Sequence, residues 1–397
     1  MSSVIRQWAG EKKRRSQTIT KLAEKAGWSR RQAAQELKYA EENGIPVKTY
    51  MQLGYWNIPH DQLLEAHTND AHRKDIAQKL VERRSGNKTV EAVERDMIEA
   101  KYKYGLRYGY FKNYGWDRLT DEQKEQMLLR PHSEQMSMKY RLPDANSDFL
   151  DDKQQLYTAF PDLIKRKWMH YEPSMTLEEF QEKTASFTSK EVIYKPDISS
   201  GGHGIEKFSL EGGTEALYKQ LQEEVNEPAL IEECLLQHPE MARLCSDSIN
   251  TVRVVVLYWE GEYHLLYTVC RMGAGNGKPV DNVSRGGWGV AVDPETGQFN
   301  TVAANHRGRS IREHPVSGVE LKGFQIPYWT EVLELVKKAA IRTYELAGLG
   351  YTGWDIAITP DGPAIIEGNN WPSPSLVQLA YWKEQKKGMK YLFEPYL

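Results

Sequence analysis

Two carboxylates and an amide near the end of the chain have the types and spacing to hold a hard divalent cation. The segment GWDIAITPDGPAIIEGNN (353–370) is typical of two short strands joined by a tight turn. If the hairpin is centred on Asp361, Asp355 lies directly opposite Glu367, and Asn369 points to the same face. Opposed carboxylates repel each other, whereas Mg²⁺ binds carboxylate and amide oxygens together with substrate phosphates. The spacing alone leaves two interpretations open, a metal site or a solvated, salt-screened face.

The same register gives the hairpin an apolar second face. Ile356 would face Ile366, and Ile358 would face Ala364. We therefore expect the acidic face to project from a sheet whose other face is buried.

A glycine-rich segment, YKPDISSGGHGI (194–205), could lie close against phosphates. Backbone N–H groups of such a loop can cradle phosphate oxygens, and a lysine at the strand end adds a point charge. The alternative is a plain hairpin turn that needs positive φ angles. GAGNGKP (273–279) is too short for a P-loop, and no GxGxxG lies between a predicted strand and a predicted helix. The candidate residues are Lys195, Ser199, Ser200, Gly201, Gly202 and Gly204.

The elements that must position these residues change character near residue 147. Before it, the periodicity predicts polar helices over 18–43 and 89–104 and one beginning at Thr120, with no alternating strand pattern. Beyond it, a long helix is predicted over 330–346. Strands are predicted over 191–194, 229–232, 251–258, 263–270, 290–292, 355–358 and 364–367. This order indicates an α+β fold rather than a regular βαβ repeat.

The totals exclude several classes of protein. The chain has 397 residues, a net charge of −3 and three cysteines. This favours more than one domain and argues against a disulfide framework or a general polyanion-binding surface. The first residues carry no apolar signal-peptide core, and no stretch approaches the roughly 18 apolar residues of a membrane span. We expect a cytoplasmic protein with no membrane partner.

Several segments in a fixed order together resemble the ATP-grasp superfamily. They are YKPDISSGGHGI, ALIEECLLQHPE (229–240), SINTVRVVVL (248–257), DNVSRGGWGVAVDPETG (281–297) and the hairpin at 353–370. The Gln-His-Pro at 237–239 and the HPVSG and LKGFQIPYW sequences within 314–329 are similar to the sugar-transfer-associated ATP-grasp family. The resemblance covers residues 147–375 well and 100–151 weakly, and it does not include residues 1–90.

The resemblance implies two α+β lobes that clamp ATP, preceded here by a mostly helical region. On that basis we expect a helical region over 1–146, a small lid lobe over 147–233 and a large metal-binding lobe over 234–397. The family's common arrangement has a Rossmann-like domain before the clamp. Its place is taken here by predicted helices, which puts the acceptor substrate in doubt more than the ATP site.

The resemblance also implies roles for individual residues. Lys153 and Lys195 match the two nucleotide lysines, and the loop from Ser199 to Gly204 would close over the β- and γ-phosphates. Asp355, Glu367 and Asn369 match the metal set for two Mg²⁺ ions, with Mn²⁺ as an alternative. The hinge matches are Glu232, Glu233 and Leu235, of which the last two would contact adenine through their backbone groups. The remaining matches are Glu240 for ribose, Asn282 in a phosphate-side loop, and Arg253 and Arg285 near the transferring phosphoryl group. Arg253, on a β-branched strand, could instead be a buried ion-pair residue.

The implied activity is ATP-dependent ligation of a small-molecule carboxylate to an amine through an acyl phosphate. A sugar, a uronic acid or an amino acid in polysaccharide or secondary-metabolite assembly fits the family's association with sugar transfer. A small-molecule kinase would share every ATP-site residue, and a clamp that binds nucleotide without turnover is a further alternative. A rival of another class is DNA binding by Lys21–Ile45, which resembles a helix-turn-helix with Arg30 and Arg31 opening its second helix. Its balanced charge argues against a nucleic-acid partner. A homodimer is left open.

Overall fold

The computed structural model describes residues 71–82, 88–197, 204–225, 227–275 and 286–397, with scattered positions between 19 and 34. The chain divides into two compact units, Met1–Thr120 and Asp121–Leu397. Within the described ranges, no helix is long and apolar enough to cross a bilayer.

The first unit is helical where it is described. Helix α6 begins where the Thr89 side chain accepts the N–H of Ala92, and it ends at Gly105 with a φ of 62°, which glycine adopts without strain. The helix predicted over 89–104 is therefore confirmed, whereas most of the segment 18–45, including the helix-turn-helix candidate, lies outside the described residues. The elements of this unit are α5 (Ala71–Glu82), α6 (Val90–Tyr104), α7 (Tyr108–Tyr114) and a 3-10 helix (Trp116–Arg118).

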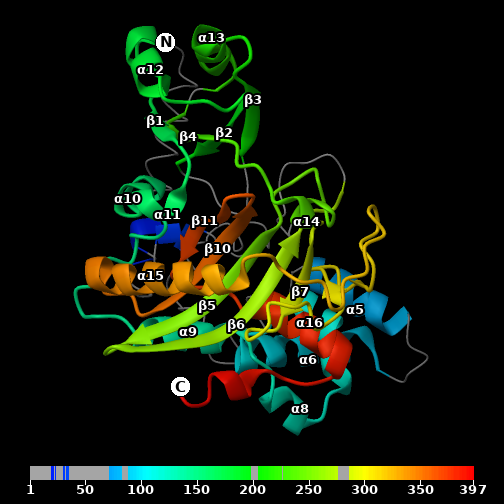
Figure 1. Ribbon diagram of the computed structural model, residues 1–397. Helices are drawn as coiled ribbons and strands as arrows, with labels where there is room; N and C mark the ends of the chain where they lie inside the picture. The colour runs from blue at the N-terminus through cyan, green and yellow to red at the C-terminus, as the bar shows by residue number, and fades with distance from the viewer. Residues whose placement is uncertain are drawn as a thin grey trace. The chain divides into compact units, whose positions relative to one another are not determined.

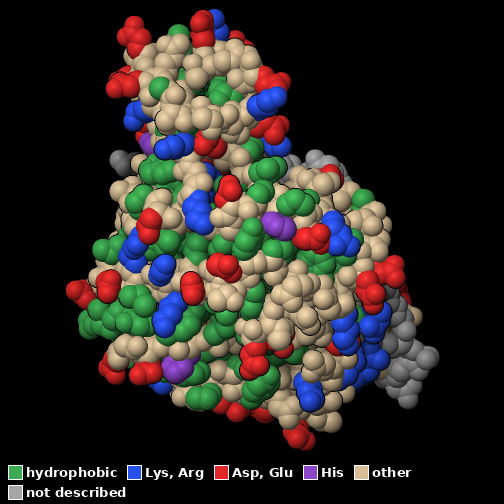
Figure 2. Space-filling view, viewed as in Figure 1, with side chains coloured by type: hydrophobic (Ala, Val, Ile, Leu, Met, Phe, Trp, Pro, Cys, Tyr) green, Lys and Arg blue, Asp and Glu red, His purple; other side chains and the backbone are tan. Residues whose placement is uncertain are grey.

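The second unit contains a four-stranded antiparallel sheet in the order β1–β4–β2–β3. Helices α12 (Leu177–Thr184) and α13 (Thr214–Glu224) cover it (Figure 1), and Phe180 and Leu217 share its core with Val192. Acidic and basic side chains are interspersed over this lobe on the face seen in Figure 2. The strands are β1 (Trp168–Tyr171), β2 (Glu191–Pro196), β3 (Glu206–Ser209) and β4 (Ala229–Glu233).

Helix α12 begins at a capping box formed by Thr176 and Glu179. The Glu179 N–H donates to Thr176 Oγ1 at 3.3 Å, and the Thr176 N–H donates to Glu179 Oε2 at 2.8 Å. Two of the helix's otherwise unpaired amide groups are thereby satisfied.

A seven-stranded sheet forms the larger part of the second unit, in the order β11–β10–β5–β6–β7–β8–β9. Helix α15 (Trp329–Ala347) lies across one face (Figure 1), where Val332 and Val336 share a core with Val254 and Ile356. The α+β fold predicted from the sequence is confirmed. The strands are β5 (Thr251–Trp259), β6 (Glu262–Met272), β7 (Trp288–Val292), β8 (Ala303–Ala304), β9 (Ser310–Ile311), β10 (Tyr351–Thr359) and β11 (Gly362–Asn369).

Shorter helices surround this sheet or join it to the smaller one. They are α8 (Asp121–Glu125), α9 (Arg130–Lys139), α10 (Lys153–Ala159), α11 (Pro161–Ile164), α14 (Pro239–Ala242), α16 (Ser375–Gln385) and a 3-10 helix (Lys390–Leu392).

The β10–β11 hairpin has the predicted pairing at its functional end and a different one at its turn. Asp355 pairs with Glu367, as predicted. Ile356 pairs with Ile365 and Ile358 with Pro363, so the predicted partners Ile366 and Ala364 are wrong. The turn has two residues between Thr359 and Gly362 rather than a centre on Asp361, and a β-bulge beside Asp355 restores the register.

Trp354 generates a stability prediction because its indole is fully buried with its ring centroid 5.5 Å from that of Phe160. Trp354→Ala should lower the free energy of unfolding by about 3–5 kcal/mol through lost burial and a residual cavity. Urea denaturation followed by circular dichroism measures the loss. The control is Leu346→Ala, at a side chain that is 57% exposed, which should change stability by about 0.5 kcal/mol or less. Equal losses in the two variants would contradict the burial argument.

Candidate active site

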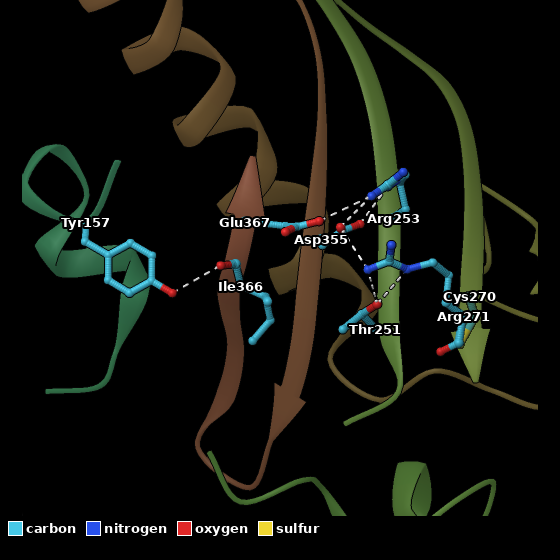
Figure 3. Close-up of polar contacts among 8 residues, drawn as sticks. All are labelled: Tyr157, Thr251, Arg253, Cys270, Arg271, Asp355, Ile366 and Glu367. Atoms are coloured by element: carbon cyan, nitrogen blue, oxygen red, sulfur yellow. Dashed lines mark hydrogen bonds and ion pairs between the residues drawn. The ribbon is translucent and has the colours of Figure 1, made fainter. Parts of the chain in front are cut away.

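A buried carboxylate, Asp355, lies at the centre of the sheet face opposite α15. Its side chain is fully buried and receives two hydrogen bonds from Arg253, Nε to Oδ1 at 2.7 Å and an Nη to Oδ2 at 2.6 Å. Arg271 donates to the same Oδ2 at 2.9 Å and also to Thr251 Oγ1 (Figure 3). The register of β10, β5 and β6 places these four side chains on one face.

The two guanidinium groups determine the charge state of Asp355. Burial alone would raise the pKa of this carboxyl, but Arg253 and Arg271 outweigh burial and hold the pKa well below its ordinary range. Asp355 therefore remains ionised across the working pH range. The repulsion expected between opposed carboxylates is offset by arginine. Arg253 is a partly buried ion-pair residue as well as a candidate for phosphate contact.

Glu367 and Asn369 extend this face toward the edge of the sheet. The Glu367 side chain is 39% exposed and has one oxygen 3.6 Å from an Nη of Arg253. Asn369 lies two residues further along β11, on the same face, and its buried Nδ2 has no hydrogen-bond partner among the described residues. No three His, Cys, Asp or Glu side chains converge in the described part of the chain, so a metal here would need the Asn369 amide. The Glu367 carboxylate and the Asn369 amide oxygen fit Mg²⁺, which takes its other ligands from phosphate and water. Both oxygens of Asp355, the third residue of the predicted metal set, accept hydrogen bonds from arginine.

Helix α9 supports the chain that leaves this strand. Ser133 Oγ donates to Pro372 O at 2.7 Å, and Ser137 Oγ donates to Asn370 O at 2.9 Å. The serines are four residues apart and so share one helix face. The segment that follows Asn369 is thereby held at two carbonyl groups.

A second buried cluster lies at the base of the four-stranded sheet, around Glu232. Lys195 Nζ is 2.6 Å from Glu232 Oε1, and Arg166 donates to Oε2 at 2.8 Å. Tyr157 donates its hydroxyl to the same Oε2 at 2.5 Å. Burial alone would raise the pKa of Glu232, but the two cations lower it to about 2. Glu232 and Tyr157 also keep the pKa of Lys195 above its ordinary value, against the effect of burial, so both members of the pair stay charged.

Lys153 lies beside the start of the glycine-rich loop. Its Nζ donates to Pro196 O at 3.0 Å and to Asp197 O at 3.3 Å. At the far end of the loop Gly204 has a φ of 69°, and a Cβ there would lie 2.9 Å from Pro196 Cγ. Glycine is required at this position, and the loop's two ends approach each other at Pro196.

The predicted hinge lies at the end of β4, with Glu232 and Glu233 inside the strand and Leu235 just beyond it. The Glu233 N–H donates to Lys167 O at 3.0 Å, and its carboxylate caps the turn at Thr188 and Ser189. Burial would raise the pKa of Glu233, but these backbone donors lower it. No acceptor for the Leu235 N–H is found among the described residues. Glu240 is exposed and pairs with Arg243 at 2.6 Å.

Other site residues lie outside the described ranges or went unnoticed in the sequence. Ser199, Ser200, Gly201, Gly202, Asn282 and Arg285 belong to the first group. The residues that sequence reasoning missed are Arg271, Arg166 and Tyr157. Arg271 carries the signal that singled out Arg253, a charge within an apolar strand. Arg166 is hidden in the basic run of residues 165–167.

Comparison with known protein families identifies the family of this chain. A family model described as sugar-transfer associated ATP-grasp matches residues 138–390, more than half of the chain, and confirms the resemblance seen in the sequence. No curated protein matches the sequence.

Solved structures with a similar fold include three ligases or synthetases. An ADP complex of N5-carboxyaminoimidazole ribonucleotide synthetase aligns at 12% identity over 58% of this chain and 47% of that chain, with a TM-score of 0.36. The D-alanine-D-alanine ligase from Coxiella burnetii aligns at 11% identity over 63% and 61%, with a TM-score of 0.34. The L-amino acid ligase from Bacillus licheniformis aligns at 12% identity over 60% and 44%, with a TM-score of 0.35. The chain thus spans less than two thirds of these structures, and likeness at this level identifies no function.

The Glu232 cluster generates a prediction about acid stability. Glu232→Gln should lower the free energy of unfolding by about 3–5 kcal/mol at neutral pH, because it leaves Lys195 and Arg166 without their buried counter-ion. Because the folded-state pKa of Glu232 is depressed, its contribution is fully present above its ordinary pKa of 4.5 and is lost as the pH falls toward 2.

Denaturant unfolding at a series of pH values checks this. The difference between wild type and Glu232→Gln should shrink as the pH falls through that window. Glu206→Gln, on the exposed part of β3, is the matched control and should track the wild type. A difference that stays constant down to pH 2 would mean that Glu232 is not the titrating group.

Proposed function

Because the chain belongs to the sugar-transfer-associated ATP-grasp family, we propose that it is an ATP-dependent carboxylate–amine ligase of the cytoplasm. The observation that carries the proposal is the sheet face on which Arg253, Asp355, Glu367 and Asn369 lie together. It supplies cationic groups for a transferring phosphoryl group beside oxygen donors for a divalent ion.

In this proposal the two sheets belong to two lobes that clamp ATP, a lid lobe over 147–233 and a metal-binding lobe over 234–397. Lys195 and Lys153 contact phosphates, and the loop from Ser199 to Gly204 closes over them. The proximity of both lysines to Pro196 supports this, since Lys195 precedes it and Lys153 donates to its carbonyl.

The hinge is the proposed adenine site. The N–H of Leu235 is available to a base edge, and Glu233 contributes through its carbonyl because its own N–H is engaged. Glu232 acts indirectly by holding Lys195 charged and in place. Glu240 would reach ribose by exchanging its exposed Arg243 partner, at little cost since surface ion pairs contribute about 0–1 kcal/mol.

Glu367 and Asn369, with Asp355 behind them, would hold Mg²⁺, or Mn²⁺ in its place. When bound, the ion neutralises phosphate charge and orients the γ-phosphoryl group. Arg253 stands on the same face, 3.6 Å from Glu367. Its guanidinium would stabilise charge on the equatorial oxygens, and Arg285 and Asn282 would act from the adjoining loop.

The proposed reaction has two balanced steps. A substrate carboxylate oxygen attacks the γ-phosphorus of ATP, and the bond between that phosphorus and the β,γ-bridging oxygen breaks. ADP leaves, and the substrate remains as an acyl phosphate. An amine nitrogen then attacks the acyl carbon, the carbon–oxygen bond breaks, and phosphate leaves with an amide formed and a proton released. The acyl phosphate must be shielded from water. In this proposal, closure of the glycine-rich loop excludes that water. A sugar, uronic acid or amino acid is the proposed substrate class.

Glu367→Gln and Lys195→Ala should each reduce Mg²⁺-dependent ADP formation by about 10²–10³-fold, because each removes a charge that stabilises the transition state. Glu367→Gln should keep wild-type stability, since the carboxylate is partly exposed. Steady-state ADP release measures the effect. Glu182→Gln on the exposed side of α12 is the matched control. Full activity in Glu367→Gln would contradict the assignment of metal binding to this sheet face.

The product mass decides between ligase and kinase. Purified protein is incubated with ATP, Mg²⁺ and pooled amino acids, amino sugars and uronic acids, and ADP and product masses are read in the same wells. A mass equal to two substrates minus water, with ADP formed, is the expected result. A stable gain of one phosphate would instead identify a small-molecule kinase. ATP binding without ADP formation in any pool would contradict turnover of these substrates.

A further inference from the structure

Two buried side chains that no motif singled out, Tyr157 and Arg166, contact both the Lys195–Glu232 pair and the strand that carries Glu367. We propose that they are positioning residues that couple the phosphate-binding lysine to the metal-binding strand. The inference rests on the proposed function, because it takes Lys195 as a phosphate contact and Glu367 as a metal ligand. In this inference, Tyr157 and Arg166 fix the position of Lys195 relative to Glu367.

Arg166 makes the charged half of the connection. Its side chain is only 2% exposed. One Nη donates to Ile365 O of β11 at 2.7 Å, and the other donates to Glu232 Oε2 at 2.8 Å. The planar guanidinium holds these two contacts in a fixed geometry that an ammonium group cannot reproduce.

Tyr157 makes the neutral half. Its hydroxyl is 2.5 Å from Glu232 Oε2 and 3.3 Å from Ile366 O, the second contact being drawn in Figure 3. It also accepts hydrogen bonds from Lys195 at 3.4 Å and from Arg166. A phenol has a single proton to donate, so Glu232 and the Ile366 carbonyl compete for it. Any ligand that draws Lys195 or Glu232 away therefore changes the hydrogen bond to β11.

The contacted part of β11 is the part that aims Glu367. Strand β11 is the edge of its sheet, so its outward carbonyls have no neighbouring strand. Ile366 is the extra residue of the bulge, between the Ile356–Ile365 and Asp355–Glu367 pairs, and it directly precedes Glu367. Bulges redirect neighbouring side chains. Contacts at Ile365 and Ile366 therefore fix the direction of the carboxylate.

Such a connection has a measurable consequence. If occupancy at Lys195 and occupancy at Glu367 favour one arrangement, Mg²⁺ must tighten ATP binding by the factor by which ATP tightens Mg²⁺ binding. The sheet pairing and the arginines around Asp355 can hold Glu367 without this connection, but they do not contact Lys195. Loss of Tyr157 or Arg166 should therefore lower the coupling more than it lowers either affinity alone.

The experiment measures ATP binding by calorimetry with Mg²⁺ and with EDTA, and takes the ratio of the two dissociation constants. In Tyr157→Phe and Arg166→Met this ratio should fall by about tenfold, within the usual range of coupling between sites, with ATP affinity in EDTA changed much less. Arg166→Lys keeps the positive charge but cannot reproduce the paired hydrogen bonds to Ile365 O and Glu232 Oε2. It should recover thermal stability relative to Arg166→Met but not the ratio.

The matched control is Arg342→Met, which breaks a contact to Asp162 at the neighbouring α11 without touching Lys195 or β11, and should keep the wild-type ratio. An unchanged ratio in Tyr157→Phe and Arg166→Met would overturn the inference, as would full recovery of the ratio in Arg166→Lys. Failure of the proposed function looks different: the wild type itself would then bind no ATP, or would bind it equally with and without Mg²⁺.

Discussion

A fully buried, ionised carboxylate needs cationic partners close to it. This constraint on Asp355 determines which side chains share one face of the large sheet. In an apolar interior an unpaired carboxylate would bind a proton and lose its charge. Arginines from two neighbouring strands, Arg253 and Arg271, keep it ionised through three hydrogen bonds. The same pairing fixes the face on which Glu367 and Asn369 must lie, because side chains alternate along each strand.

The cluster around Glu232 repeats this arrangement. There Glu232 is the buried anion, and its partners Lys195 and Arg166 outnumber it. The cluster therefore carries excess positive charge in a position where solvent cannot screen it. Such a site favours an anionic ligand more strongly than the same charges would at a surface.

The sequence allowed the fold class, the longer strands and the Asp355–Glu367 pairing to be predicted, because each depends on local patterns. The predicted hairpin pairing nearer the turn was wrong. The Pro-Asp-Gly sequence marks the turn but does not fix its length, and a bulge beside Asp355 offsets the two-residue turn. Strand β1 was not predicted because its partner, β4, is distant in the sequence. Strand β8, Ala303–Ala304, is too short to show an alternating pattern. The roles of Arg271 and Arg166 could be identified only from the folded structure, in which Arg271 contacts Asp355 and Arg166 contacts Glu232. Glu233 was read as a hinge contact, whereas its side chain also caps a turn.

In the proposed function, one sheet face receives both the metal and the phosphates of ATP. The decisive test is a crystal structure with a non-hydrolysable ATP analogue and Mn²⁺, because anomalous scattering locates the manganese ion. We expect a manganese peak within coordination distance of Glu367 and Asn369, with the terminal phosphates between that peak and Lys195. Nucleotide bound away from this face, or a manganese peak that contacts neither side chain, would contradict it.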